Sequence, residues 1–188
     1  MANEPRFLHI QSGIPDFEKS VAYLSSANAK DIDRAIVFVH GFSGSATSTW
    51  TDFLTLVDDK MTSRWWETAD LFFLHYWWDS MFKRIPRNTN TLMRFIEYLF
   101  PKPPQELFEA AEMSLRPQFE YKHLTLVAHS EGGLLVRKII LDVADAHHRL
   151  DKYLRDRMIT QMKEPDAEGI EVAELRLFAP ALGGESLT

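Results

Sequence analysis

Four continuous apolar runs constrain the fold of this chain more than any other feature of its sequence. They are AIVFVH at 35–40, DLFFLHYW at 70–77, HLTLVAH at 123–129 and ELRLFAP at 174–180. Runs without polar alternation are typical of strands that helices cover on both faces of a sheet. Amphipathic patterns between the runs predict helices over 50–61, 90–100, 104–115 and 132–150. This alternation predicts an α/β fold with a doubly wound, mostly parallel sheet and right-handed crossovers.

The segments outside these predicted strands and helices also carry structural predictions. Residues 7–11, FLHIQ, predict an N-terminal edge strand, and the charged residues 151–169 predict a surface connection. Residues 80–122 are long for one crossover, so we expect a small insertion or a lid-like excursion there. A chain of 188 residues suits one domain with a substantial core, and we expect residues 1–188 to form a single domain.

The composition excludes several classes of function. There is no cysteine, which excludes disulfides, thiolate catalysis and thiolate metal sites. The net charge of -6 argues against a nucleic-acid partner. No apolar run approaches the roughly 18 residues that a membrane span needs, and MANEPRFLHIQSG lacks the features of a secretion signal. We therefore expect a cytoplasmic protein without a transmembrane segment, unless a leader precedes these residues.

The segment AHSEGG at 128–133 joins a predicted strand to a predicted helix. A serine on such a tight strand-to-helix turn exposes its hydroxyl at the edge of a sheet, provided that small residues stand two places before and after it. Ala128 and Gly132 meet this demand, and Gly133 lets the helix pack close to the strand. Serine is also a favoured helix N-cap, which is the alternative explanation. The pattern favours Ser130 as a nucleophile.

A serine that attacks an ester needs backbone N–H donors for the negative charge that develops on the carbonyl oxygen. Glu131, directly after the serine, would supply one donor. The run at 35–40 ends in a small-residue loop, where Gly41 frees the backbone to turn and Phe42 would supply the second donor, with Ser43 less favoured. We therefore expect an oxyanion hole built from two loops.

Three segments together give the chain a family resemblance. They are VFVHGFSGS…TW ending at Trp50, VAHSEGGLLV around Ser130, and LRLFAPALGG near the end. With these motifs in this order, the chain resembles the α/β-hydrolases and, among them, the lipase-like serine esterases. The resemblance implies ester or amide hydrolysis, and we expect a small-molecule carboxylic ester as the substrate, lipid-like esters included. It also implies a serine nucleophile, a histidine base and an acidic partner, with no metal and no organic cofactor.

The histidine base is the part of this scheme that the sequence does not supply. The resemblance implies the order serine, acid, histidine, and only His147 and His148 follow Ser130. They fall on the predicted helix, about 25 Å from the serine at 1.5 Å per residue, whereas a base must come within about 3 Å. Glu185 is the candidate acid.

We therefore expect a chain truncated at its C-terminus that lacks the last strands of the family, an unconventional base, or a scaffold that no longer catalyses. A sheet edge left uncovered beside LRLFAP would favour self-association.

Three other histidines have structural interpretations as the default. His40 is expected to brace the loop that carries Gly41, and His129 to pack beside the serine turn. His75 ends the run at 70–77, on the same edge as the serine, and is the first alternative base.

Aromatic and basic side chains gather in the first half of the chain. Packing is the default interpretation of the aromatic residues, and an acyl-binding wall is the alternative for Tyr76, Trp77, Trp78 and Phe82. A solvated face explains the basic cluster, and a contact to a head-group phosphate is the alternative for Lys83, Arg84, Arg87 and Arg94.

The sequence thus favours a serine hydrolase of the α/β-hydrolase fold. The alternative is a catalytically silent module of the same fold that binds a small ligand or a protein partner.

Overall fold

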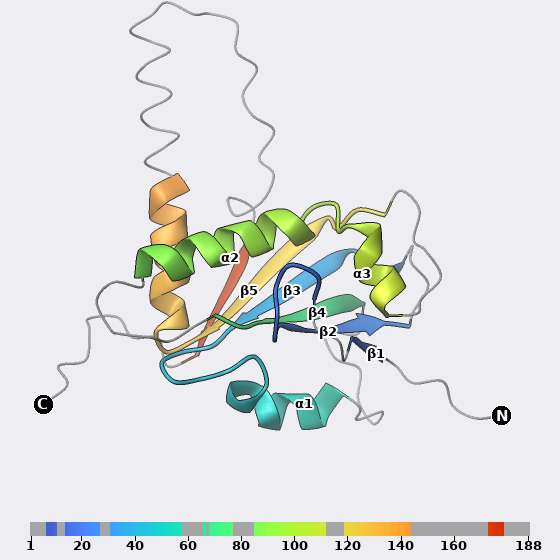
Figure 1. Cartoon of the computed structure of the whole chain (residues 1–188), viewed down its shortest axis with the longest axis horizontal. Helices are drawn as coiled ribbons and strands as arrows, with labels where there is room; N and C mark the ends of the chain where they lie inside the picture. Colours follow the sequence, from blue (N-terminus) through green and yellow to red (C-terminus); the bar gives the residue numbers. More distant parts are fainter. Residues whose placement is uncertain are drawn as a thin grey trace, which may run out of the picture.

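A mixed sheet of six strands forms the centre of this α/β structure (Figure 1). The computed structural model describes residues 7–10, 14–26, 31–57, 66, 68–76, 85–111, 119–143 and 173–178. The strands are β1 Phe7–Ile10, β2 Val21–Ser25, β3 Arg34–Val39, β4 Ala69–Leu74, β5 His123–His129 and β6 Glu174–Phe178. Their order in the sheet is β1-β2-β4-β3-β5-β6. The strands β4, β3, β5 and β6 are parallel, and β1 and β2 run antiparallel to their neighbours.

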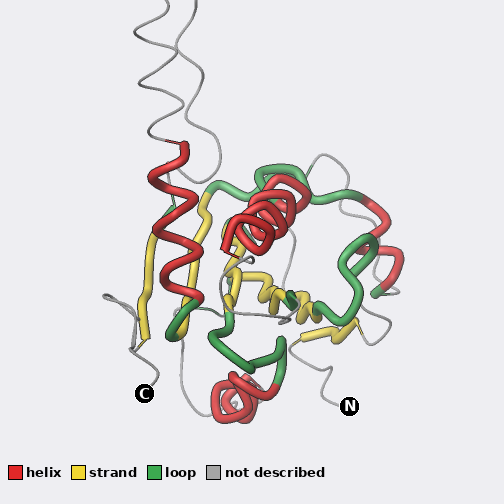
Figure 2. The backbone as a smooth tube through the Cα atoms, turned by 60° about the vertical axis from the view of Figure 1, so that its left-hand side comes forward, coloured by secondary structure: helices red, strands yellow, loops and turns green. Residues whose placement is uncertain are grey.

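Helices cover the sheet on both faces. They are η2 Ser48–Trp50, α1 Thr51–Val57, α2 Ile85–Leu99, α3 Gln105–Ala110 and a helix over residues 132–143. The strands separate α1 from α2, α3 and the helix over 132–143, which lie on the opposite face (Figures 1 and 2).

The side chains of β3 show why its sequence is apolar without interruption. Val37 belongs to the core shared with α2, where Leu92 and Phe95 are also buried. Its neighbour Phe38 points to the other face and packs with Trp50 in a second core. Because both faces are covered, successive residues of the strand are all buried.

All four apolar runs form strands, and the edge strand predicted at the N-terminus is β1. The predicted strand at 70–77 is shorter in the structure, because β4 ends at Leu74 and the His75 N–H donates to Ser20 Oγ at 2.9 Å. Helix α2 begins at Ile85, earlier than predicted. Pro86 is tolerated there because the N–H groups in the first turn of a helix make no intrahelical hydrogen bond, so proline loses none. The short antiparallel strand β2 was not predicted.

Residues 80–122 contain α2 and α3 in their described part. Both helices contribute to the core on one face of the sheet, through Leu92, Phe95 and Leu99 of α2 and Leu107 and Phe108 of α3. Residues 77–84 and 112–118, where the rest of this segment falls, lie outside the described residues.

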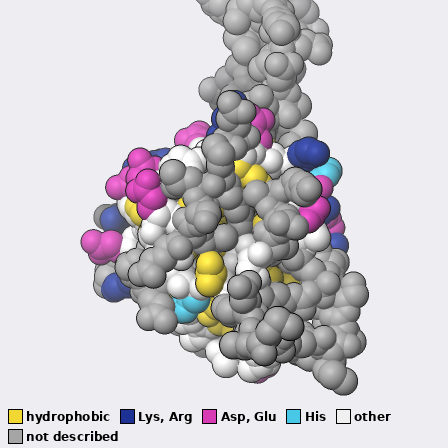
Figure 3. Space-filling model, turned by 90° about the vertical axis from the view of Figure 1, so that its right-hand side faces the viewer, with side chains coloured by type: hydrophobic (Ala, Val, Ile, Leu, Met, Phe, Trp, Pro, Cys, Tyr) yellow, Lys and Arg dark blue, Asp and Glu magenta, His cyan; other side chains and the backbone are white. Residues whose placement is uncertain are grey.

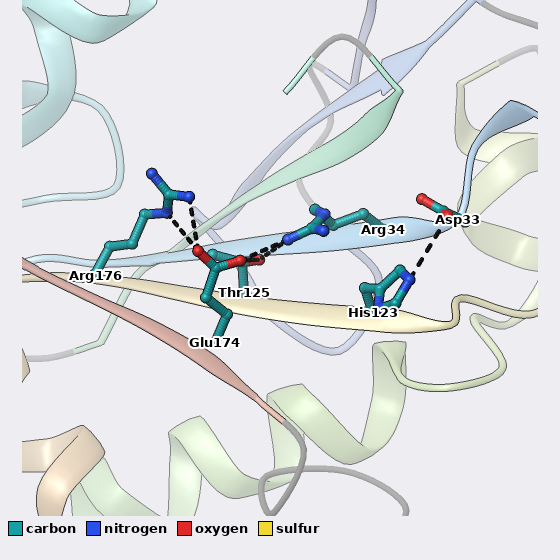
Figure 4. A network of polar contacts seen from close by, with 6 residues as sticks. All are labelled: Asp33, Arg34, His123, Thr125, Glu174 and Arg176. Carbon is teal, nitrogen blue, oxygen red and sulfur yellow. Dashed lines mark hydrogen bonds and ion pairs between the residues drawn. The ribbon is translucent and has the colours of Figure 1, made fainter. Parts of the chain in front are cut away.

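A polar network joins three strands at the end of the sheet where the parallel strands begin (Figure 4). Arg34 Nη1 of β3 donates to Thr125 Oγ1 of β5 at 2.9 Å and to Glu174 Oε2 of β6 at 2.7 Å. Glu174 Oε1 also accepts from Arg176 Nη2 at 2.7 Å, and hydrogen bonds from Arg176 and Arg34 hold the pKa of Glu174 below its usual range. These side chains are partly exposed, so the network sets the register of β6 more than it adds stability.

Among the described residues on the face seen in Figure 3, acidic and basic side chains are mixed, and hydrophobic side chains show as small separate patches. No helix within the described residues has the length and apolar character needed to cross a bilayer.

Candidate active site

Ser130 stands on a tight turn directly after β5, and the next helix begins at residue 132. Its φ is 52°, in the left-handed region that L-residues other than glycine rarely adopt, at a cost of roughly 1–2 kcal/mol. Two hydrogen bonds hold the turn: the Ser130 N–H donates to the Phe178 carbonyl at 3.0 Å, and the Gly133 N–H donates to the Ser130 carbonyl at 3.0 Å. Strained residues of this kind concentrate at functional sites.

Two glycines allow two backbone segments, residues 39–41 and 129–132, to meet at this turn. A Cβ on Gly41 would lie 2.7 Å from Ser130 Cβ and 3.2 Å from Ser130 Oγ. A Cβ on Gly132 would lie 2.5 Å from the Val39 carbonyl oxygen and 2.7 Å from that of His40. Real Cβ atoms essentially never approach within 3.0 Å, so only glycine fits at these positions. The structure thus brings the loop after β3 against the side chain of Ser130.

His40 is fully buried below this loop. Its Nδ1–H donates to the Gly41 carbonyl at 2.9 Å, and its ring stacks on Tyr76 with centroids 4.0 Å apart. Burial lowers the pKa of His40 to about 4, so the ring is neutral near pH 7. With Nδ1 committed to the carbonyl, His40 braces the loop.

Tyr76 completes this support. Its hydroxyl donates to the His40 carbonyl. Burial, and then the charge of Glu131, raise the pKa of Tyr76, so its hydroxyl stays protonated and remains a donor. In the structure, Tyr76 therefore supports His40 in the loop that packs against Ser130.

Aromatic side chains surround the other side of the turn. His129 pairs with Phe178 across β5 and β6, and the Trp50 ring lies 6.2 Å from His129 and 6.5 Å from Phe178 between centroids. His129 Nδ1 and Trp50 Nε1 are buried without a hydrogen-bond partner among the described residues. Phe42 and Phe178 are each 53% exposed. The site therefore combines a serine with exposed apolar side chains.

Phe178 was missed in the sequence as a neighbour of the serine. The signal lies in the parallel pairing: residues that end two adjacent parallel strands meet at one edge, and the runs at 123–129 and 174–180 both end there. Recognising this required knowing that β5 and β6 are adjacent.

His75, the alternative base, lies on this edge of the sheet beside His40, with 5.9 Å between ring centroids. Burial, and then the charge of Lys19, lower its pKa. In the described part of the chain, no hydrogen bond joins a histidine to Ser130. The described residues also contain no group of three His, Asp or Glu side chains able to hold a metal ion.

Several predicted site residues lie outside the described residues. They are Trp77, Trp78, Phe82, His147, His148 and Glu185.

No family model matches the chain, and no curated protein matches it. Among solved structures, it is similar to a tributyrin phosphonate-inhibited esterase B from Lactobacillus rhamnosis, with 12% sequence identity and a TM-score of 0.36. The similarity covers 72% of this chain and 38% of that chain.

Proposed function

We propose that this chain is a serine hydrolase of the α/β-hydrolase type that acts on carboxylic esters. Ser130 is the nucleophile, and the backbone N–H groups of Phe42 and Glu131 form the oxyanion hole. His40, Gly41, His129, Gly132 and Gly133 support the turn and the loop. No metal or organic cofactor takes part in this scheme.

One observation carries the proposal: the left-handed Ser130 has the loop of Gly41 packed against its side chain. A serine that merely capped a helix would need neither the strained φ nor a neighbouring glycine at which an added Cβ would lie 3.2 Å from the serine hydroxyl oxygen. A nucleophile needs both, because the hydroxyl must be exposed and backbone donors must reach the developing oxyanion.

The histidine base is proposed to lie outside the described residues, as is the acid, for which Glu185 remains the candidate. His40 does not suit this role, since its pKa near 4 and its bond to Gly41 make it a weak and immobile acceptor.

The second candidate function is a catalytically silent module that binds a small ligand or a protein partner. The observation that favours it is the lack of a hydrogen bond between any histidine and Ser130 within the described part of the chain.

Reaction with a fluorophosphonate probe distinguishes the two functions, because only an activated serine is labelled. We expect covalent labelling of the chain at one residue, lost in Ser130→Ala, with unchanged circular dichroism. Mass spectrometry of the labelled peptide locates the modified residue. A folded chain that takes up no probe, in the presence of any segment that follows residue 188, would favour the silent module.

The exposed Phe178 predicts a preference for apolar acyl groups. An acyl chain that reaches the serine would cover this ring, so Phe178→Ala should slow labelling by an octyl fluorophosphonate about 5- to 20-fold more than labelling by the ethyl analogue. Leu141→Ala is the matched control, since Leu141 is also apolar and exposed but lies on the helix over 132–143. An equal loss for both probes would assign Phe178 to packing alone.

A further inference from the structure

The strand β6 lies at one end of the sheet, and within the described residues it pairs only with β5 (Figure 1). The Phe178 carbonyl of β6 accepts a hydrogen bond from the Ser130 N–H, so the backbone groups of Phe178 point towards β5. Because the backbone groups of successive residues in a strand point alternately to its two sides, those of Leu175 and Leu177 point to the outer edge of the sheet. Backbone groups at such an edge can pair with a strand of another chain.

The side chains at the centre of β6 are apolar on one face of the sheet and charged on the other. Leu175 pairs with the core residue Leu126, so Leu175 and Leu177 lie on the face that α2 covers, where each is 39% exposed. Glu174 and Arg176 lie on the opposite face, and Arg176 Nη2 donates to Glu174 Oε1 at 2.7 Å (Figure 4). Exposed leucines on an edge strand favour pairing with another chain, and two charges of opposite sign can determine how that chain aligns.

We propose that β6 pairs in an antiparallel orientation with β6 of a second copy of this chain, with Leu175 of the two copies directly opposite each other. A two-fold axis perpendicular to the sheet then relates the copies, and two-fold symmetry is the commonest symmetry of protein oligomers. Leu175 exchanges two backbone hydrogen bonds with Leu175 of the second copy, and Leu177 lies opposite Ala173. The apolar side chains that each copy exposes at this edge are thereby covered.

Charge complementarity selects this register among those that the two-fold axis allows. With Leu175 on the axis, Glu174 of each copy lies opposite Arg176 of the other, in non-hydrogen-bonded pairs whose side chains come closest. The ion pair within each chain can persist, because the four charges alternate in sign around the axis. A register with Leu175 opposite Leu177 would place the two copies of Arg176 directly opposite each other, and like charges are unfavourable there. With Leu177 on the axis, Arg176 would lie opposite Phe178, and this pair has no opposite charges.

Disulfide cross-linking tests the register, because the chain contains no cysteine and Leu175→Cys therefore gives a protein with one thiol. In the proposed pairing the two Cα atoms at position 175 lie about 5.5 Å apart, within the range of about 4.4–6.8 Å that disulfides span. Leu177→Cys is the matched control, since Leu177 is equally exposed on the same face but its two copies lie about 14 Å apart. Under mild oxidation, Leu175→Cys should form the covalent dimer at least about tenfold faster than Leu177→Cys. Equal rates, or no covalent dimer of Leu175→Cys, would overturn the proposal.

Charge reversals in the Leu175→Cys protein test the pairing of Glu174 with Arg176. Arg176→Glu places two acidic side chains opposite each other, and Glu174→Arg places two basic ones opposite each other. Each should slow cross-linking about 5- to 10-fold at low ionic strength. A mixture of the two variants restores pairs of opposite charge between unlike copies, so it should recover most of the lost rate. A mixture that cross-links no faster than either variant alone would overturn the proposed pairing.

Two controls in the same Leu175→Cys protein separate this interface from other effects. Arg34→Gln removes a hydrogen bond to Glu174 Oε2 within the chain but leaves the charges of β6 unchanged, so the cross-linking rate should not change. A loss of rate in Arg34→Gln as large as that in Arg176→Glu would overturn the charge pairing between copies. Ser130→Ala should also keep the rate, so a failure of the proposed hydrolase activity and a failure of this proposal are separate results.

Discussion

Ser130→Gly is expected to remove all fluorophosphonate labelling and to leave a protein about 1 kcal/mol more stable than Ser130→Ala. Both substitutions delete the hydroxyl, so both should be inert. They differ in the backbone, because Ser130 has a φ of 52°, which glycine adopts readily and alanine does not. For a chain of this size, 1 kcal/mol corresponds to roughly 2–4 °C in Tm.

Thermal unfolding of the two variants and the wild-type chain checks this prediction. Ser130→Ala should melt close to the wild type, since both keep the strained turn. A Ser130→Gly protein no more stable than Ser130→Ala would show that the turn is not strained in solution. Retained labelling in either variant would show that the reactive group belongs to another residue. The expected combination, higher stability with lost reactivity, is the usual trade-off at a strained functional position.

Gly132→Val should destabilise the fold by about 3 kcal/mol or more, or prevent folding. A Cβ at this position would lie 2.5 Å from the Val39 carbonyl oxygen and 3.1 Å from the Val39 carbonyl carbon. These atoms belong to the backbone at the end of β3, which is a central strand and cannot shift without breaking its pairing with β4 and β5. Urea unfolding measures the loss directly.

The control for this substitution is Arg137→Val. Arg137 is exposed on the same helix, so the control reports only the lower helix propensity of valine, about 0.5 kcal/mol. If Gly132→Val cost no more than Arg137→Val, the helix would not begin in contact with the end of β3.

The serine turn of the candidate site could be predicted because its signals are local. A serine between Ala128 and Gly132, at the junction of a strand pattern and a helix pattern, marks a tight turn from a few consecutive residues. The segment from His40 to Phe42 is equally local. The sequence also indicated that both belong to one edge, since both follow apolar runs that a parallel sheet aligns. The close approach of Gly41 to Ser130 could not be predicted, because it joins two segments that lie far apart in the sequence.

Other features depended on contacts between distant segments. The strand β2 has five residues and only partial burial, so its alternation is too short to stand out from a loop. Its place beside β4 comes from antiparallel pairing of Val21 with Phe73, residues that lie far apart in the chain. A cavity beside Tyr76 likewise needs the loop at 16–19 and α2 together.

The sequence by itself determined that this chain forms a sheet covered on both faces. A strand that is apolar without interruption has apolar side chains on both faces, and their exposure to water is smallest when helices cover both. The sequence also determined which serine stands on a tight turn, because such a turn requires small residues two places before and after the serine. The tertiary structure alone decided the order of the strands. That order places Phe178 next to Ser130, a contact that forms only when β6 pairs with β5. The tertiary structure also decided that His40, which the sequence predicted as the brace of this loop, is buried and neutral, since the pKa of a buried histidine depends on neighbours that local sequence does not reveal.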